Sequence, residues 1–184
     1  MNRTRNTLPP AVRKAAITAL NNTVAELFDL FARIKQAHWN VRGTTFIGLH
    51  KLLDEFAVRT LNHIDVAAER ATALGGVVEG TLRESVKRSR LKKKEEPASV
   101  SGMRDWINEL AEVHASSGEH VRTAIRKVTD AGDFGSADLH GYYSCPGPAA
   151  LAPGSASQPA TAKLKRTGFR QKIEKRTGKW NLWM

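Results

Sequence analysis

The sequence predicts an all-α protein, built as a bundle of amphipathic helices. Apolar residues recur at three- and four-residue steps through three long segments, and no segment has the pattern of a strand. The chain has 184 residues, of which 41% are apolar, so it is long enough for one well-buried domain and short for two. We therefore expect a single helical core.

The first two helices are expected on either side of a short break at residues 43–45. The first follows a proline pair at residues 9 and 10, which suits a first helical turn but not a helix interior. Its apolar stripe consists of Leu20, Val24, Leu27, Phe31 and Ile34. The second begins after Gly43, Thr44 and Thr45, which offer a break and a cap, and it ends at the glycine pair 75–76. Its periodic positions are Phe46, Leu49, Leu53, Phe56, Thr60, Ile64 and Ala67.

The third helix is expected from about Gly102 to Val128, with Asp130, Gly132 and Asp133 ending it. Its apolar positions are Trp106, Leu110, Val113, Val121, Ile125 and Val128. Before it, residues 83–97 are highly charged, lack a sustained apolar stripe and end in proline. This composition indicates a mostly exposed connection with room for a short helix.

The last quarter of the chain has a different composition. No charged residue occurs between Asp138 and Lys163, prolines alternate there with glycine, alanine and serine, and a basic run follows. Such a segment cannot continue the helical pattern, and its simplest interpretation is a disordered basic tail. We expect a basic amino-terminal arm over residues 1–10, a helical domain over residues 11–140, and a tail outside that domain over residues 141–184.

The net charge of +11 at first suggests a nucleic-acid partner. However, residues 141–184 hold eight basic residues and one acidic residue, so they account for seven of these charges. The remaining four match Arg3, Arg5, Arg13 and Lys14, which leaves residues 15–140 neutral in formal count. These four cations could bind DNA as a basic arm, or they could serve solubility.

The chain shows no membrane or secretory signal. No apolar stretch approaches the roughly 20 residues that cross a bilayer, and the amino terminus lacks a long apolar segment. The single cysteine, Cys145, cannot form an intramolecular disulfide, so nothing requires an oxidising compartment. We expect a soluble, cytoplasmic protein with no membrane partner.

A polar stripe on the second helix is the strongest candidate for a site. His50, Asp54, Asp65 and Glu69 fall within an arc of roughly 100°, and each follows an apolar position directly. His38 continues the apolar stripe of the first helix. Burying these groups unpaired is costly, and a metal ion would satisfy them. The alternative is that the carboxylates are solvated and the histidine is a hydrogen-bonded core residue.

The spacing within this stripe predicts how a metal site would be built. Asp54 and Asp65 are eleven residues apart, which is about 16 Å along a helix, so one ion cannot contact both pairs. If the helix packs antiparallel against its own copy, about a two-fold axis near residues 59 and 60, the two pairs face each other across the contact. Two identical intersubunit sites then form. Nitrogen and oxygen ligands suit iron, manganese or zinc, and spacing does not choose among them.

The other histidines have weaker signals. His63 lies on a different side of its helix from Asp65, and His114 and His120 have no comparable set of acids. We expect them to be ordinary surface or core residues, and we expect Trp39 to serve packing.

Two segments resemble the signature of the Dps family, which are mini-ferritins. They read AHWNVRGTTFIGLHKLLDEF over residues 37–56 and NHIDVAAERATALGG over residues 62–76, and a looser likeness runs from about residue 12 to 139. The resemblance implies a ferritin-like four-helix bundle, and it places the ferroxidase and iron ligands at His38, His50, Asp54, Asp65 and Glu69. It also implies a hollow dodecamer that oxidises ferrous iron, usually with hydrogen peroxide, and stores it. Many relatives also coat DNA, which suggests association with the nucleoid.

The chain departs from this family after Asp138 and Leu139, where a fourth amphipathic helix should follow. We expect that helix to be lost or irregular, and we hypothesise a change of reading frame near His140. Codons for residues 150–158, read one nucleotide later, can encode Leu-Trp-Leu-Leu-Glu-Ala-His-Leu, and the gene's nucleotide sequence tests this. A three-helix remnant would expose apolar faces, so poor stability and doubtful assembly are expected. The alternative functions are a DNA-compacting protein with little oxidase activity, or a product that does not assemble.

Overall fold

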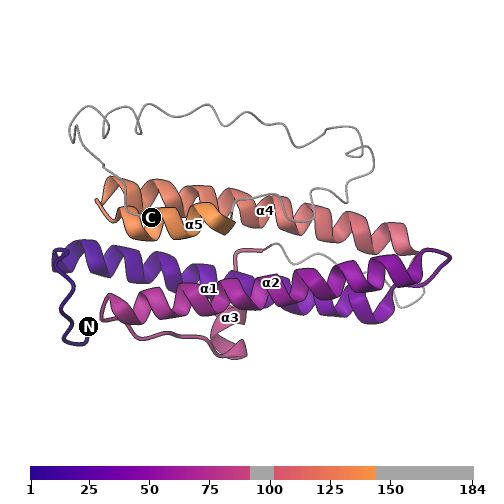
Figure 1. The fold of residues 1–184 in the computed structure, drawn as a ribbon, viewed down its shortest axis with the longest axis horizontal. Helices are drawn as coiled ribbons and strands as arrows, with labels where there is room; N and C mark the ends of the chain where they lie inside the picture. Colours follow the sequence, from indigo (N-terminus) through magenta and orange to yellow (C-terminus); the bar gives the residue numbers. More distant parts are fainter. Residues whose placement is uncertain (92–101, 144–184) are drawn as a thin grey trace, which may run out of the picture.

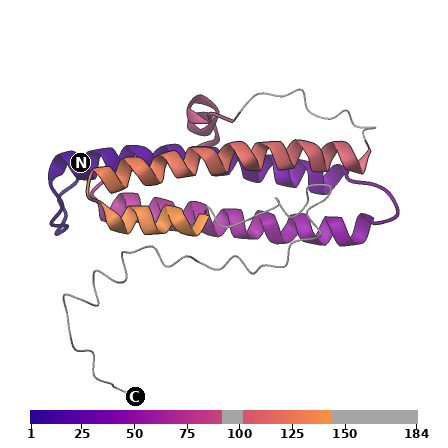
Figure 2. The same cartoon turned by 90° about the horizontal axis from the view of Figure 1, so that it is seen from above.

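All the secondary structure in the described part of the chain is helical. The computed structural model describes residues 1–91 and 102–143, with only the backbone of residues 142 and 143. The elements are α1 (Pro10–Asn40), α2 (Phe46–Ala73), α3 (Leu82–Arg88), α4 (Met103–Asp130) and α5 (Phe134–Tyr143). Figures 1 and 2 show three long helices lying side by side, with the short α5 next to α4. The short α5 thus takes the fourth position beside the long helices α1, α2 and α4, and the described elements confirm the predicted all-α class.

The core lies among α1, α2 and α4. α1 packs most extensively on α2, and it also contacts α4 and α3. Most of the predicted apolar stripe positions are buried, and Leu20, Val24 and Ile34 are fully so. Phe46 is an exception at 37% exposed, because its ring lies against His50 at the start of α2 rather than in the core.

The turn between α1 and α2 differs in one detail from the prediction. Gly43 has a φ of +128°, a conformation that favours glycine, so it provides the predicted break. Thr45 occupies the N-cap position of α2 but makes no side-chain cap. Its hydroxyl donates instead to Met103 Sδ at 3.0 Å, so the predicted cap is wrong. The turn is thereby joined to the start of α4.

The α4–α5 turn is fastened to α2 by a buried carboxylate. Asp133 is 1% exposed; it accepts hydrogen bonds from the backbone and hydroxyl of Ser136 and from Arg70 Nη2 at 2.7 Å. Burial opposes ionisation of Asp133, but these donors outweigh it and lower the pKa of the carboxyl group. Asp133 thus begins α5 and holds it beside α2.

The predicted domain boundary at residue 140 falls inside a helix. α5 runs to residue 143, and His140 is fully buried, with its Nε2 3.1 Å from the Thr23 hydroxyl of α1. The helix that buries His140 against α1 thus continues to residue 143, and the boundary of the domain itself stays a prediction. The rest of the predicted tail, with Cys145 and the segment of the proposed frame change, lies outside the described residues.

The amino-terminal arm lies against the carboxyl end of α2. The Asn2 backbone donates to the Gly75 carbonyl at 2.7 Å, and the Thr4 hydroxyl donates to the Ala73 carbonyl at 3.0 Å. Gly75 has a φ of +85°, and a Cβ added there would lie 2.6 Å from the Asn2 carbonyl oxygen. Glycine is therefore required at this approach.

None of the described helices is both long and apolar enough to cross a membrane.

Candidate metal centre

The α1–α2 hairpin brings two of the predicted ligands into direct contact. His38 lies in the last turn of α1 and His50 lies four residues into α2, so the antiparallel helices place them side by side. Their rings stack with centroids 3.6 Å apart and planes 23° apart. His38 is 6% exposed, and the ring of Phe46 lies 4.8 Å from the ring of His50. The pair is thus held between the helix ends.

Two reciprocal hydrogen bonds orient these rings. His38 Nδ1 lies 3.0 Å from the His50 carbonyl oxygen, and His50 Nδ1 lies 3.0 Å from the His38 carbonyl oxygen. A carbonyl oxygen only accepts hydrogen bonds, so each Nδ1 carries the proton. In the neutral ring, Nε2 then keeps its lone pair. Nε2 is therefore the ring nitrogen that is available to bind a metal ion.

Asp54 joins this pair one helical turn beyond His50. Its Oδ1 lies 3.8 Å from His38 Nδ1 and accepts a hydrogen bond from Lys35 Nζ at 2.7 Å. The hydrogen bond from Lys35 is the main reason that the pKa of the Asp54 carboxyl is lowered. The side chain is 56% exposed, so the carboxylate is open on its outer side. Three of the five predicted ligands therefore lie together.

The other two predicted ligands do not reach this group within one chain. Asp65 and Glu69 are exposed on the outer side of α2, about three and about four helical turns farther along the helix than Asp54. In the described ranges, 1–91 and 102–143, no cluster of three or more His, Cys, Asp or Glu side chains is suited to hold a metal ion. The intersubunit arrangement stays a prediction, and it is the one that this separation requires.

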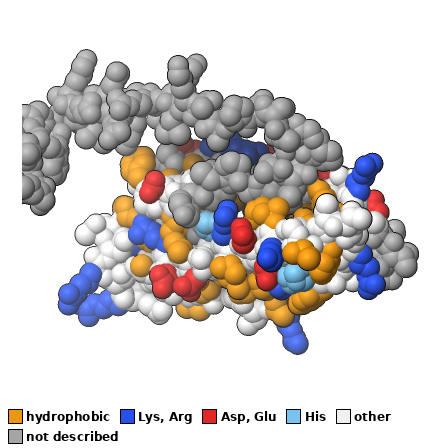
Figure 3. Space-filling model, turned by 45° about the vertical axis from the view of Figure 1, so that its right-hand side comes forward, with side chains coloured by type: hydrophobic (Ala, Val, Ile, Leu, Met, Phe, Trp, Pro, Cys, Tyr) orange, Lys and Arg blue, Asp and Glu red, His pale blue; other side chains and the backbone are white. Residues whose placement is uncertain are grey.

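Exposed apolar residues separate the two halves of the stripe. Val58 is 57% exposed and Leu61 is 42% exposed, and both lie on α2 between Asp54 and Asp65. At 100° per residue they share the angular range of the polar stripe. Figure 3 shows one side of the molecule, where hydrophobic side chains lie at the surface among acidic and basic ones. In the part of the chain that the structure describes, Val58 and Leu61 thus leave apolar surface exposed on this face of α2.

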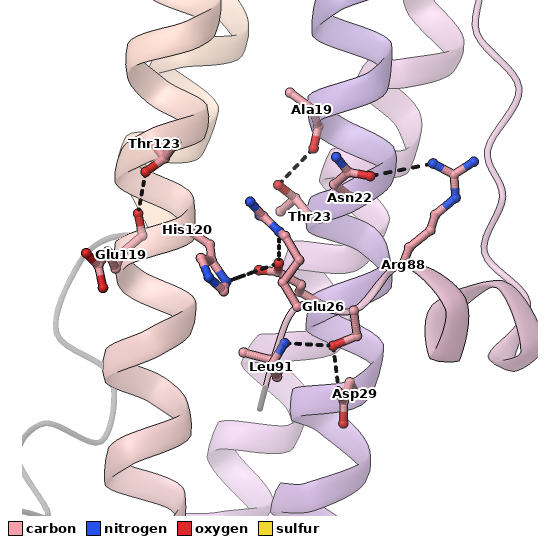
Figure 4. Close-up of polar contacts among 12 residues, drawn as sticks. Ala19, Asn22, Thr23, Glu26, Asp29, Arg88, Leu91, Glu119, His120 and Thr123 are labelled. Carbon is pink, nitrogen blue, oxygen red and sulfur yellow. Dashed lines mark hydrogen bonds and ion pairs between the residues drawn. The ribbon is translucent and has the colours of Figure 1, made fainter. Parts of the chain in front are cut away.

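A buried polar cluster lies between α1 and α4, and the sequence did not predict it. Glu26 is 2% exposed; its carboxylate accepts from Arg90 Nε at 2.5 Å and lies 3.1 Å from His120 Nδ1 (Figure 4). The sequence does not reveal this partner of His120, because Glu26 lies 94 residues away in the chain. A single acid is not a set of ligands comparable to the stripe on α2, so His120 stays outside the candidate metal site. The only local signal was that Glu26 lies one helical turn before the buried Leu30.

The same cluster anchors the chain that leaves α3. The Ser89 hydroxyl donates to Asp29 Oδ2 at 2.6 Å, and Arg88 contacts Asn22 (Figure 4). Arg88 also forms an ion pair with Glu79. Every acid in it already has a cationic or hydroxyl partner. We therefore interpret the cluster as a fastening between the α3–α4 connection and α1, rather than as a second metal site.

Comparison with known proteins identifies the family. A family model described as a ferritin-like domain matches residues 17–142. The DNA protection during starvation protein of Agrobacterium fabrum is 36% identical over 137 residues, which cover 74% of this chain and 83% of that protein. The chain belongs to the Dps family of the ferritin-like superfamily. The predicted family resemblance is therefore confirmed.

Solved Dps structures agree with this assignment. DpsC from Streptomyces coelicolor superposes with a TM-score of 0.72 at 30% identity, covering 77% of this chain and 81% of that chain. Dps from Listeria monocytogenes superposes with a TM-score of 0.66 at 24% identity, which supports the fold alone. Within the Dps fold, the stacked histidine pair and Asp54 lie at the α1–α2 end of the bundle.

Proposed function

We propose that this protein is a Dps-type ferroxidase and iron store, which oxidises ferrous iron with hydrogen peroxide and thereby protects DNA. The histidine pair carries the proposal. Its reciprocal Nδ1 hydrogen bonds leave both Nε2 atoms available as metal ligands. The Asp54 carboxylate lies beside the pair, with its Oδ1 3.8 Å from His38 Nδ1. The name of the Agrobacterium fabrum relative, a DNA protection during starvation protein, supports the same role.

The complete site is proposed to form between two subunits. A two-fold axis near residues 59 and 60 would pack Val58 and Leu61 against their copies, which would cover the exposed apolar residues of α2. The same contact would bring Asp65 and Glu69 of one subunit to His38, His50 and Asp54 of the other. The proposal extends to the family's dodecamer as the assembled form.

Each group in this site has a distinct task toward the substrate iron. The two imidazoles bind ferrous iron, and the three carboxylates favour the ferric product, because hard anionic oxygen ligands stabilise the higher charge. In the proposed reaction, two ferrous ions each give one electron to hydrogen peroxide, which takes up two protons and becomes two water molecules, so that no hydroxyl radical is released. The reciprocal hydrogen bonds keep both rings in a binding orientation throughout.

A second candidate function is DNA compaction with little oxidase activity, acting in the cytoplasm at the nucleoid. Arg3 and Arg5 are exposed on an arm that is hydrogen-bonded to the end of α2. These two exposed cations favour DNA binding. Arg13 is a weaker candidate than predicted, because its guanidinium donates to the carbonyls of Leu8 and Leu74. Lys14 is exposed and is kept in the DNA-binding proposal.

Two substitutions separate the candidates. His50→Ala and Asp54→Asn should abolish peroxide-dependent oxidation of ferrous iron, measured by absorbance, while DNA retention in a gel stays unchanged. Glu55→Gln is the matched control, because it removes one exposed carboxylate next to Asp54 without touching the stripe. A parent protein that binds DNA but does not oxidise iron would support the second candidate and reject the first.

A further inference from the structure

Lys35 forms an ion pair with Asp54, one of the proposed metal ligands. It lies on α1 one turn before His38, and its Nζ is 2.7 Å from Asp54 Oδ1 on α2. The lysine side chain is only 21% exposed, and its Nζ also lies 5.8 Å from the centre of the Trp39 ring. The ammonium group is therefore held over the carboxylate by two partners rather than extended into solvent.

This contact puts a positive charge where a metal ion would bind. Asp54 Oδ1 accepts from Lys35 and is also the atom that lies 3.8 Å from His38. A metal ion bound by His38 and Asp54 would lie within a few ångströms of the ammonium unless the ion pair opened. Metal binding is opposed in both cases. If the Lys35–Asp54 ion pair opens, breaking it costs free energy; if it stays closed, the ammonium group and the metal ion repel each other.

We propose that Lys35 is a resident cation that competes with divalent metal ions for Asp54 and so sets the affinity of the site. This inference rests on the proposed function, because it takes Asp54 as a ligand. The net charge of the proposed two-subunit site is consistent with this competition between Lys35 and a metal ion. Asp54 together with Asp65 and Glu69 of a second subunit carries three negative charges, and Lys35 reduces the total to two, which a single divalent ion balances. Removing the lysine leaves an excess negative charge at the ligands.

The test measures binding of Co²⁺ by the full chain, using equilibrium dialysis without any oxidant. Lys35→Gln should bind Co²⁺ about tenfold more tightly than the parent, because repulsion of a divalent ion by an ammonium about 4 Å away corresponds to at least that factor in water. Lys35→Arg keeps the charge, so its affinity should equal or fall below that of the parent. Lys51→Gln removes one exposed lysine from α2 near the site and is the charge-matched control, with an affinity close to that of the parent.

A second pair of variants shows whether the effect acts through Asp54. In an Asp54→Asn background, adding Lys35→Gln should raise Co²⁺ affinity by a smaller factor than in the parent, because competition for the carboxylate is gone and only the repulsion between the two cations remains. Equal or weaker binding by Lys35→Gln, no binding by either the parent or Lys35→Gln, or the same gain in the Asp54→Asn background would each overturn the proposal. Circular dichroism confirms that each variant is helical.

Failure of the proposed function has its own signature in this experiment. If His50→Ala binds Co²⁺ as tightly as the parent, the metal centre itself is wrong. If His50→Ala loses binding while Lys35→Gln matches the parent, the centre stands and only the role of Lys35 is refuted.

Discussion

A partly buried histidine of α4, His114, should make the fold sensitive to mild acid. Burial lowers the pKa of His114 from 6.5 to about 4, and its buried Nε2 has no hydrogen-bond partner among the described residues. The ring of Phe56 lies edge-on to it at 6.4 Å. The folded site therefore favours the neutral ring over the protonated ring.

The sign and size of the effect follow from the difference between the folded and unfolded pKa values. The unfolded chain takes up the proton as the pH falls through 6.5, whereas the folded chain takes it up only near 4. Stability is therefore fully present above 6.5, falls between the two values and is constant again below 4. A single histidine shifted this far contributes a loss of about 2 kcal/mol between pH 7.5 and pH 5.

The perturbation that tests this is His114→Leu, which removes the titrating group. Urea denaturation would be followed by circular dichroism at both pH values and at one protein concentration. Burial also lowers the pKa values of His63 and His140, but these groups are present in both proteins and cancel in the comparison. The variant should lose about 2 kcal/mol less stability than the parent on acidification. If both proteins lose the same amount, His114 does not titrate as the structure requires and the reasoning is refuted.

Three further predictions concern α5, assembly and DNA. Asp133→Ala should lower the free energy of unfolding by about 3 kcal/mol, because it leaves Arg70 and the start of α5 without their carboxylate partner. Urea denaturation measures this loss, and a loss below about 1 kcal/mol would contradict the prediction. Leu61→Lys should shift sedimentation toward smaller species with unchanged helicity; an unchanged distribution would exclude this face of α2 as the contact. The double variant Arg3→Gln and Arg5→Gln should weaken DNA retention and lower its salt slope by about two; equal retention would remove the arm from the proposed interface.

The long helices could be read from the sequence because their signals are local. The predicted limits of the third helix, about Gly102 to Val128, differ by at most two residues from the observed α4, Met103–Asp130. Its apolar spacing and terminators act within a few residues of one another, and they do so whatever the rest of the chain does. The helix in the fourth position, α5, was harder to predict from the sequence, because it depends on a contact between Asp133 and Arg70, which are 63 residues apart.

The candidate site divides in the same way. The spacing of His50, Asp54, Asp65 and Glu69 predicts which residues share a face and that one chain cannot gather them all. It does not predict that His38 and His50 hydrogen-bond to each other's carbonyl oxygens, because that depends on how two helices meet across a turn.

By itself, the sequence determined the helical class, the family and the face of α2 that holds the candidate ligands, because each of these follows from residues close together in the chain. Only the tertiary structure decided the partners of charged groups on different helices. Lys35 meets Asp54 across 19 residues and Glu26 meets His120 across 94. Such pairs form where helix packing brings side chains within hydrogen-bonding distance, and helical periodicity contains no information about that distance.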